Sequence, residues 1–284
     1  MRDATAPDAE AAPLPDPIAP DLLMLAYRSG IFPMSDSRDD PDVFWVEPRR
    51  RGILPPEGFR CAHSLAKTLR KGAFTVTCNA AFDDVIDACA APRRGPDGGE
   101  TWISHRIADS YRALHRRGEA HSIEVWLAGA LVGGLYGVGF DRVFCGESMF
   151  SRVRDSSKVA LAWLVAALRT GGVTLLDCQF LTDHLASMGA IEIDRADYMQ
   201  RLARAQAGLG RVPAALARLA GDQLPGTSPA SPSAGTPGGG VGTGGASAPL
   251  ALPDGFAALL AGAKSAGFSS SPGYFIAQSL THTS

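Results

Sequence analysis

The chain has 284 residues, of which 45% are hydrophobic and 20% charged, and a formal net charge of −2. This composition is typical of a globular protein, and the small net charge argues against a protein that coats nucleic acid without specificity. The N-terminus is acidic and rich in proline, unlike a signal peptide, and no apolar run is long enough to span a bilayer, so we expect a cytoplasmic protein.

The first half of the chain predicts mostly helices. Asp21 is suited to cap the first helix, and glycines at 30 and 72 are suited to end the first and second. A short stretch at 74–79 alternates between apolar and polar residues, as a strand does. The predicted elements are helices at 20–29, 60–72, 80–91 and 101–117 and a strand at 74–79.

The second half predicts a sheet covered by helices. Ala128 and Gly129 separate two alternating runs, which is a hairpin signal. A long apolar helix then begins at a cap, Asp155 or Ser156, and ends at a pair of glycines. The predicted elements are strands at 121–127, 130–136, 142–148 and 173–178 and helices at 155–170 and 182–188. This order predicts an α+β fold with a mixed sheet.

Both ends of the chain differ in composition from the middle. Residues 1–20 are rich in Pro, Ala and Asp and predict a disordered tail. Residues 223–255 form a Gly/Ser/Pro-rich linker of low complexity. In the C-terminal segment 256–284, an amphipathic stretch at 256–266 precedes a strand-like piece at 274–280, which we expect to dock onto the fold.

The segment 175–184, LLDCQFLTDH, is the strongest candidate for a chemical site. Asp177 and Gln179 are two residues apart, so on a strand they point to the same face, at the end where open sheets place their sites. Cys178 would face the opposite way, which argues against a nucleophilic pair with His184. A lone His184 is more often a cap or a core residue.

Two nearby segments carry weaker signals. Glu147 lies between apolar residues in FCGESMFS, where a carboxylate is costly unless it is paired or hydrogen-bonded. The Gly-rich segment 133–139 lacks the lysine of a phosphate loop and does not open a helix, which favours a strand approached closely by another group. The five cysteines form no CxxC pair, so neither a disulfide framework nor a metal site is expected.

Positive charges recur at helical spacing in the second predicted helix. These residues are Arg60, His63, Lys67, Arg70 and Lys71. Such a stripe suits a phosphate backbone, and a solvated face is an equally good interpretation. The triplet 49–51 adds three arginines in what reads as a loop. Trp45 and Trp102 lie beside polar sequence, where an aromatic ring can stack on a base or simply pack in the core.

Motifs spread over residues 20–205 resemble those of the leucyl/phenylalanyl-tRNA–protein transferase family. They are YRSGIFPM (27–34), FWVEPRRRGILP (44–55), GETWI (99–103), HSIEVW (121–126), LVGGLYGV (131–138), FCGESMFS (144–151) and LLDCQFLTDHLASMGA (175–190). Motifs of this length in this order are far more specific than a single loop. The resemblance implies a small N-terminal domain at 21–59 and an acetyltransferase-like (GNAT-like) catalytic domain at 60–222.

The resemblance also implies an activity. Leu, Phe and, less well, Met would be transferred from aminoacyl-tRNA to acceptor proteins that begin with Lys or Arg, which marks them for degradation. No cofactor and no metal is implied, and we expect a monomer. The donor ester is already activated toward amines, and roughly a tenth of an α-amino group is neutral at pH 7, so no strong base is required.

Site residues follow from the same resemblance. Asp177 and Gln179 match the family's proposed catalytic pair, and Glu147 matches an active-site carboxylate. The donor pocket would involve Trp45, Trp102, Phe144 and Met149. The tRNA acceptor stem would contact His63, Lys67, Arg70 and Lys71. Two departures are Thr182, where many members have Asn, and His63, which replaces a more basic residue.

Two other functions compete with this interpretation. A CoA-dependent N-acetyltransferase would share the broad fold, but Gly134 stands where its pyrophosphate loop needs a long polar residue. A non-catalytic tRNA-binding module would need the basic stripe but not the carboxylates Asp177 and Glu147.

Overall fold

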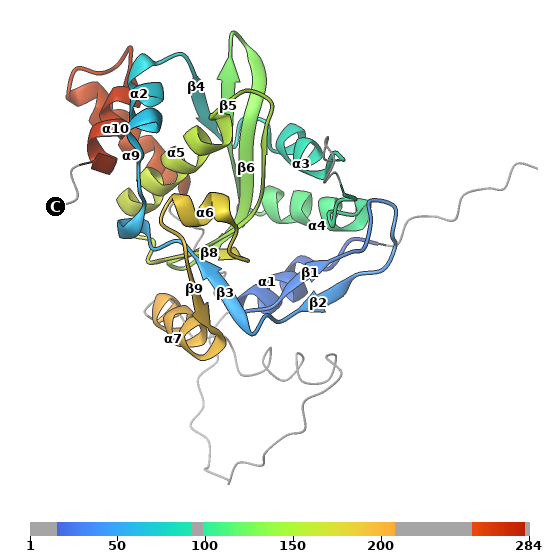
Figure 1. Ribbon diagram of the computed structural model, residues 1–284. Helices are drawn as coiled ribbons and strands as arrows, with labels where there is room; N and C mark the ends of the chain where they lie inside the picture. Colours follow the sequence, from blue (N-terminus) through green and yellow to red (C-terminus); the bar gives the residue numbers. More distant parts are fainter. Residues whose placement is uncertain (1–15, 93–98, 208–251, 282–284) are drawn as a thin grey trace, which may run out of the picture.

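The computed structural model describes residues 16–92, 99–207 and 252–281, and Figure 1 shows their arrangement. Its centre is a seven-stranded sheet in the order β4-β5-β6-β7-β8-β3-β9. The strands are β3 (Arg50–Ile53), β4 (Thr75–Cys78), β5 (Ala120–Leu127), β6 (Ala130–Phe140), β7 (Val143–Ser151), β8 (Leu175–Gln179) and β9 (Ile191–Asp194). Strands β7 and β8 are parallel and the other neighbours antiparallel, so the predicted mixed α+β fold is confirmed.

Helices cover both faces of this sheet (Figure 1). One hydrophobic cluster joins one sheet face to α2 (His63–Lys71), α5 (Ser156–Thr170), α9 (Leu252–Ser265) and α10 (Pro272–Thr281). A second cluster joins the opposite face to α1 (Pro20–Arg28), α3 (Phe82–Ala90), α4 (His105–Arg116) and α7 (Arg195–Gln206). Side chains alternate between the clusters along the strands: Leu175 belongs to the second cluster and Leu176 to the first.

Smaller elements complete the described chain. A separate two-stranded sheet pairs β1 (Phe32–Met34) with β2 (Phe44–Val46), and η1 (Pro56–Gly58) and α6 (Asp183–Ser187) are short helices. Strand β3 lies inside the predicted N-terminal domain, yet it pairs with β8 and β9 in the large sheet. The large sheet therefore combines β3, which precedes residue 60, with strands that follow residue 60. The GNAT-like character and the domain boundaries stay predictions, and most of the predicted linker lies outside the described residues.

The predicted cap of the first helix is wrong, and the second and fourth predicted helices begin later than expected, at His63 and His105. The first helix is preceded by Ala19, with Pro20 in its first turn, and Asp21 makes no capping bond but pairs with Arg117. Proline already fits the first helical turn, since it has no N–H to satisfy there. The helix predicted from residue 101 begins at His105, because the side chain of Ser104 accepts a hydrogen bond from the backbone N–H of Ile107.

The C-terminal segment docks onto the fold as predicted, but as helices. The strand predicted at 274–280 is wrong, because α10 covers this range and buries Gly273, Ile276, Ala277 and Leu280 at helical spacing. Helix α10 packs on α2 and α5, and α9 packs along α5, where the Phe256 ring lies 5.5 Å from that of Trp163. Within the described ranges, no helix has the length and apolar character needed to cross a membrane.

Close backbone contact between α10 and α2 makes a prediction about stability. A Cβ atom on Gly273 would lie 2.5 Å from the carbonyl oxygen of Leu69. Gly273→Ala is therefore expected to lower the free energy of unfolding by about 1–3 kcal/mol, since the backbones must move apart. Gly262→Ala in α9 is the matched control: its Cβ would meet Phe275 at an ordinary 3.4 Å, so helix propensity should leave it neutral or stabilising. Urea unfolding of both variants measures the difference, and equal effects would contradict the packing of α10 on α2.

Candidate active site

A cavity of about 550 Å³ opens where β7 and β8 separate. The pairing of these parallel strands ends at Cys145 and Asp177, and the residues that follow on each strand line the cavity. A crevice beyond the carboxyl ends of parallel strands is a common place for a ligand. The lining residues are Phe32, Met34, Trp102, Leu135, Tyr136, Gly146, Glu147, Ser148, Met149, Leu161, Leu164, Leu176, Cys178, Gln179, Phe180, Thr182, His184 and Leu185.

Glu147 reaches the cavity through a β-bulge. In the pairing of β6 with β7, Tyr136 lies opposite Ser148 and Gly137 opposite Gly146, so Glu147 is the extra residue. A bulge bends the strand and re-aims the side chain at the inserted position. This local irregularity turns a carboxylate toward the cavity in the middle of an otherwise regular strand.

The carboxylate of Glu147 lies in a polar but uncharged network. Its Oε2 atom accepts a hydrogen bond of 2.9 Å from the hydroxyl of Tyr111, which is itself hydrogen-bonded to the hydroxyl of Tyr27. No described Lys, Arg or His lies within ion-pair distance of it; Arg51 is paired with Asp177. Burial raises the pKa of Glu147 to about 7, although the tyrosine hydroxyls act to lower it.

Asp177 lies behind the cavity wall and is fully paired. The guanidinium of Arg51 donates two hydrogen bonds to its carboxylate, at 2.9 and 2.6 Å, and the Tyr198 hydroxyl donates a third at 2.9 Å. Asp177 is 0% exposed and does not line the cavity. The rings of Phe32 and Tyr198 enclose the guanidinium of Arg51, at 4.7 and 4.5 Å from their centroids. Asp177 is therefore one half of a buried ion pair, with Arg51 as the other half.

Gln179 connects the two carboxylates. Its backbone N–H donates to Oδ1 of Asp177 at 2.9 Å, and its side-chain Nε2 donates to Oε1 of Glu147 at 3.2 Å. Its φ of 55° is left-handed, so the chain leaves the strand here, and Gly52 on β3 permits this turn. A Cβ on Gly52 would lie 2.7 Å from the backbone of Phe180.

The contacts of Asp177 and Gln179 agree with the prediction that they share one face of β8. Asp177 is hydrogen-bonded to Tyr198 of the second hydrophobic cluster, and Gln179 is hydrogen-bonded to Glu147 on the same side. Cys178 packs on the first cluster, on the opposite face. The left-handed conformation of Gln179 ends the strand, and of the pair only Gln179 lines the cavity. The backbone hydrogen bond still makes the position of Gln179 depend on Asp177.

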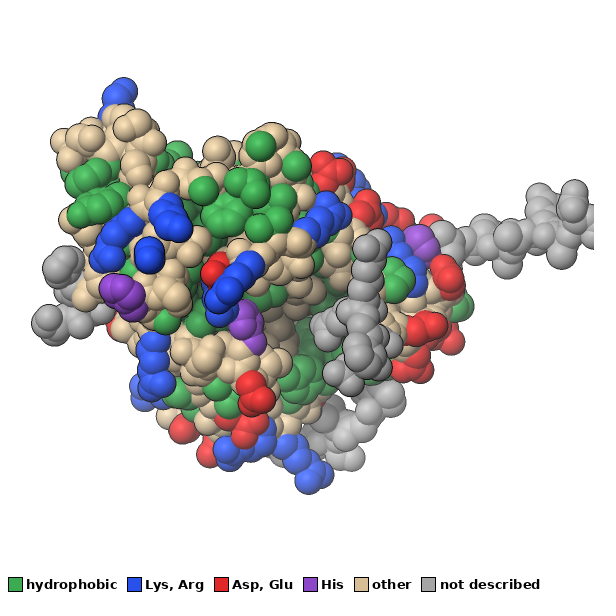
Figure 2. Space-filling model, turned by 45° about the horizontal axis from the view of Figure 1, so that its top comes forward, with side chains coloured by type: hydrophobic (Ala, Val, Ile, Leu, Met, Phe, Trp, Pro, Cys, Tyr) green, Lys and Arg blue, Asp and Glu red, His purple; other side chains and the backbone are tan. Residues whose placement is uncertain are grey.

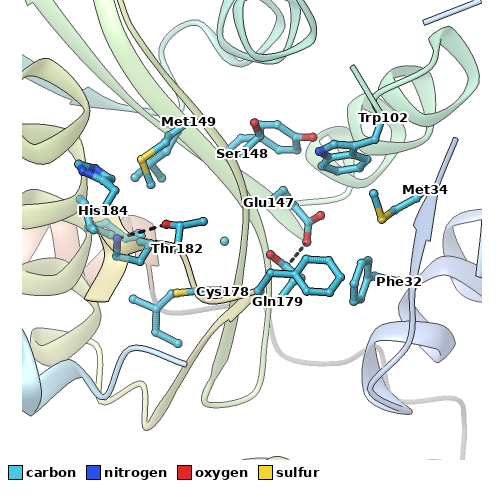
Figure 3. A pocket seen from close by; sticks show the side chains of 18 residues that line it. Phe32, Met34, Trp102, Glu147, Ser148, Met149, Cys178, Gln179, Thr182 and His184 are labelled. Atoms are coloured by element: carbon cyan, nitrogen blue, oxygen red, sulfur yellow. Dashed lines mark hydrogen bonds between the residues drawn. The ribbon is translucent and has the colours of Figure 1, made fainter. Parts of the chain in front are cut away.

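The two halves of the cavity differ in character. One half is aliphatic and is formed by Leu135, Met149, Leu161, Leu164 and Leu176. In Figure 3, Trp102, Met34 and Phe32 lie on the other side of the Glu147–Gln179 pair. The polar pair thus lies between an aliphatic space and an aromatic one.

The predicted donor-pocket residues divide into two groups. Trp102 and Met149 line the cavity. Phe144 of β7 is fully buried in the first hydrophobic cluster and Trp45 packs on the second, and neither lines this cavity. Their roles stay predictions, but direct contact with a ligand in this cavity is available only to Trp102 and Met149 among the four.

The remaining polar wall residues have specific environments. The Thr182 hydroxyl caps α6 by accepting from the N–H of Leu185 at 3.3 Å. Cys178 and His184 both line the cavity without a hydrogen bond between them, and burial raises the pKa of the Cys178 thiol, which keeps it uncharged. The buried hydroxyl of Tyr136 has no partner among the described residues and is available to a ligand. The described residues contain no cluster of side chains arranged to hold a metal.

The basic stripe occupies the exposed face of α2. His63, Lys67, Arg70 and Lys71 are exposed, while Leu65, Ala66 and Leu69 face the core. The described residues show no acidic partner for any of the four within ion-pair distance. Figure 2 shows Lys and Arg side chains gathered on the side of the molecule where α2 lies.

Sequence reasoning missed the groups that support the site. The arginine triplet was expected in a loop, but Arg51 lies in β3, with only 2% of its side chain exposed. The available signal was its spacing from an apolar residue. Arg51 lies two residues before Ile53, so on a strand both side chains point to the same, inward face. Three tyrosine hydroxyls were missed as well, those of Tyr27, Tyr111 and Tyr198 on α1, α4 and α7. In the sequence these tyrosines look like aromatic residues that only pack in the core.

Comparisons with known proteins agree with these motifs. The family model described as leucyl/phenylalanyl-tRNA protein transferase matches residues 53–203, and that of its N-terminal domain matches residues 16–49. A leucyl/phenylalanyl-tRNA–protein transferase of Novosphingobium aromaticivorans is 62% identical over 276 residues, which cover 95% of this chain and 98% of the relative. One from Zymomonas mobilis is 59% identical and covers 65% of this chain and 68% of its own length.

A lower likeness, at 12% identity and a TM-score of 0.32, is found to the solved structure of L-PGS from Bacillus licheniformis, over 58% of this chain and 54% of that one. The family models together match more than half of the chain, and the first relative spans nearly all of it. The chain therefore belongs to the leucyl/phenylalanyl-tRNA–protein transferase family, which transfers amino acids from aminoacyl-tRNA to proteins.

Proposed function

We propose that this chain transfers leucine, phenylalanine and, less efficiently, methionine from tRNA to acceptor proteins that begin with Lys or Arg, and so marks them for degradation. The observation that carries the proposal is a single cavity in which the Glu147–Gln179 pair lies between an aliphatic and an aromatic half. The protein would act in the cytoplasm as a monomer, without cofactor or metal.

The aliphatic half suits the donor side chain. Leu135, Leu161 and Leu164 offer apolar contact without a polar group to satisfy. Such a pocket separates side chains by only about 1–3 kcal/mol per methylene, so it favours Leu and Phe over small residues and admits flexible Met to some degree. The ring of Trp102 in the other half suits the terminal adenosine by stacking.

The reaction is aminolysis of the aminoacyl ester, and Gln179 is suited to align the amine. Because Nε2 of Gln179 donates to Glu147, its Oε1 is left to accept a hydrogen bond from the attacking amine. Holding amine and ester in contact can contribute on the order of 7–11 kcal/mol to lowering the barrier. Asp177 acts as a positioning residue, since it contacts the backbone of Gln179 and not the cavity.

A neighbouring cavity supports a preference for Lys or Arg at the acceptor N-terminus. It has a volume of about 300 Å³ and shares Met34, Trp102 and Ser148 with the first cavity. The carboxylates of Asp36 and Glu100 are part of its lining, and a cationic side chain is favoured beside them.

The proposal is tested by incubating the purified protein with labelled Leu-tRNA and a peptide that begins with Arg. We expect label on the peptide and none on the same peptide with an acetylated N-terminus. Bound tRNA without transfer would favour a tRNA-binding module. A shift of the melting temperature by acetyl-CoA, with no transfer from Leu-tRNA, would favour an acetyltransferase.

The basic face of α2 makes a further prediction about tRNA binding. Lys67→Ala with Arg70→Ala is expected to weaken binding roughly tenfold and to reduce the slope of log K against log salt by about 1–2, because phosphate contacts release counterions. The rate at saturating Leu-tRNA should change little. Arg201→Ala with Arg204→Ala removes the same charge from α7 and is the control. Equal losses in the two double variants would show that net charge, and not α2, governs binding.

A further inference from the structure

The two carboxylates of the site, the fully buried Asp177 and the half-buried Glu147, differ in charge compensation. Asp177 has the guanidinium of Arg51 at 2.6 Å. Among the described residues, Glu147 has only neutral hydrogen-bond donors, namely Tyr27, Tyr111 and Gln179. A carboxylate that is largely removed from water and has no cation beside it is stabilised when a cation binds or when it takes up a proton. Of the two, Glu147 is therefore the group left to interact with an incoming cationic substrate.

Glu147 also has the geometry to accept a proton from the cavity. A carboxylate has two lone-pair positions on each oxygen, and the three donors Tyr27, Tyr111 and Gln179 leave at least one of the four free. Its side chain lines the cavity beside Gln179, the group that would align the amine. Figure 3 shows the carboxylate pointing toward Gln179.

The environment of Glu147 brings its pKa close to neutral pH. Tyr27 of α1, Tyr111 of α4 and Tyr136 of β6 face it, and burial raises the pKa of each of these hydroxyls well above its ordinary value. The nearby charges, those of Asp177 and Arg51, act on it in opposite directions. Burial is the largest influence and brings its pKa to about 7, close to that of a protein α-amino group.

We propose that Glu147 is the proton acceptor for the α-ammonium of the acceptor protein. The proposal rests on the proposed function. Glu147 binds the ammonium and takes one proton, which leaves the nitrogen lone pair free to attack the ester carbonyl. The new C–N bond forms, the bond from the carbonyl carbon to the ribose oxygen breaks, and the second nitrogen proton passes to that oxygen. The proton held by Glu147 then goes to water.

Neither member of the predicted catalytic pair can take this role. The amide of Gln179 is not basic at neutral pH, so it aligns the amine but does not remove a proton. Asp177 accepts four hydrogen bonds, from Arg51, Tyr198 and the backbone of Gln179, and does not reach the cavity.

The experiment compares Glu147→Gln with the wild type in single-turnover transfer from Leu-tRNA to an Arg-starting peptide, at subsaturating peptide, between pH 6 and 8. With a pKa of about 7 for Glu147 and of about 7.7–8.0 for the amine, the wild-type rate should rise about fourfold over this range. The variant needs an amine that is already neutral, so its rate should rise about 40-fold. The ratio of the wild-type rate to the variant rate should thus fall about tenfold between pH 6 and pH 8.

A second variant tests the same idea with the carboxylate in place. Tyr111→Phe removes a hydrogen bond that stabilises the ionised form of Glu147, so its pKa rises and the acidic limb of the rate profile moves to higher pH. Tyr274→Phe, in the exposed part of α10, is the matched control and should leave the profile unchanged. This arm decides the question if Glu147→Gln does not fold.

Parallel pH profiles for wild type, Glu147→Gln and Tyr111→Phe would overturn the proposal, because a purely structural role lowers the rate equally at every pH. So would a raised Kd for Leu-tRNA as the only effect of Glu147→Gln, since Glu147 would then serve the amine of the donor. Absence of transfer by the wild type would instead refute the proposed function.

Discussion

Replacement of Arg51 by methionine is expected to lower the free energy of unfolding by about 3–5 kcal/mol, because it leaves the carboxylate of Asp177 buried without its cation. Both side chains are almost completely inaccessible, at 2% and 0% exposure. Removing one partner leaves an uncompensated buried charge, which is strongly destabilising. Replacing both partners by apolar residues often leaves the stability unchanged. Chemical denaturation, followed by circular dichroism, measures the change.

Two further variants make this test specific. Arg50→Met, on the same strand, breaks an exposed ion pair with Glu192 and should cost no more than about 1 kcal/mol. The double variant Arg51→Met with Asp177→Leu removes both charges and should regain most of the stability without regaining transfer activity. Recovery of activity in the double variant would show that the ion pair does not position Gln179. Equal losses for Arg50→Met and Arg51→Met would contradict the buried pair itself.

Gln179→Ala is expected to lower kcat by about 10²–10³-fold, which is the usual cost of removing one aligned hydrogen-bonding group from an active site. The KM for Leu-tRNA should change little, because Gln179 is proposed to contact the amine and not the tRNA. The backbone conformation at this position is already left-handed with a side chain present, so alanine adds no new strain. Steady-state rates at saturating Leu-tRNA measure the effect.

The neighbouring residue provides the control for this prediction. Cys178→Ala alters the same cavity wall, yet the raised pKa of this thiol keeps it uncharged, so transfer should stay within a few-fold of the wild type. A loss of activity in Cys178→Ala comparable to that in Gln179→Ala would revive the Cys178–His184 pair as the reactive group. A normal kcat in Gln179→Ala would remove Gln179 from the mechanism.

Local patterns were sufficient where a local interaction decides the structure. The hairpin at Ala128 and Gly129 and the long apolar helix α5 were predicted close to their observed bounds, since turn geometry and helical periodicity depend on near neighbours. The strand expected at 274–280 failed for a related reason: a short apolar run fits a strand or a helix equally well. Contact with α2 and α5 decided for the helix.

The site shows the same division. The sequence by itself determined the family, the candidate pair Asp177 and Gln179, and the unusual placement of Glu147. Only the tertiary structure decided that Arg51 neutralises Asp177 from a strand 126 residues away, while Glu147 faces the cavity beside neutral tyrosines. Charge compensation and burial depend on which distant segments meet in space, and no local periodicity of the chain contains that information.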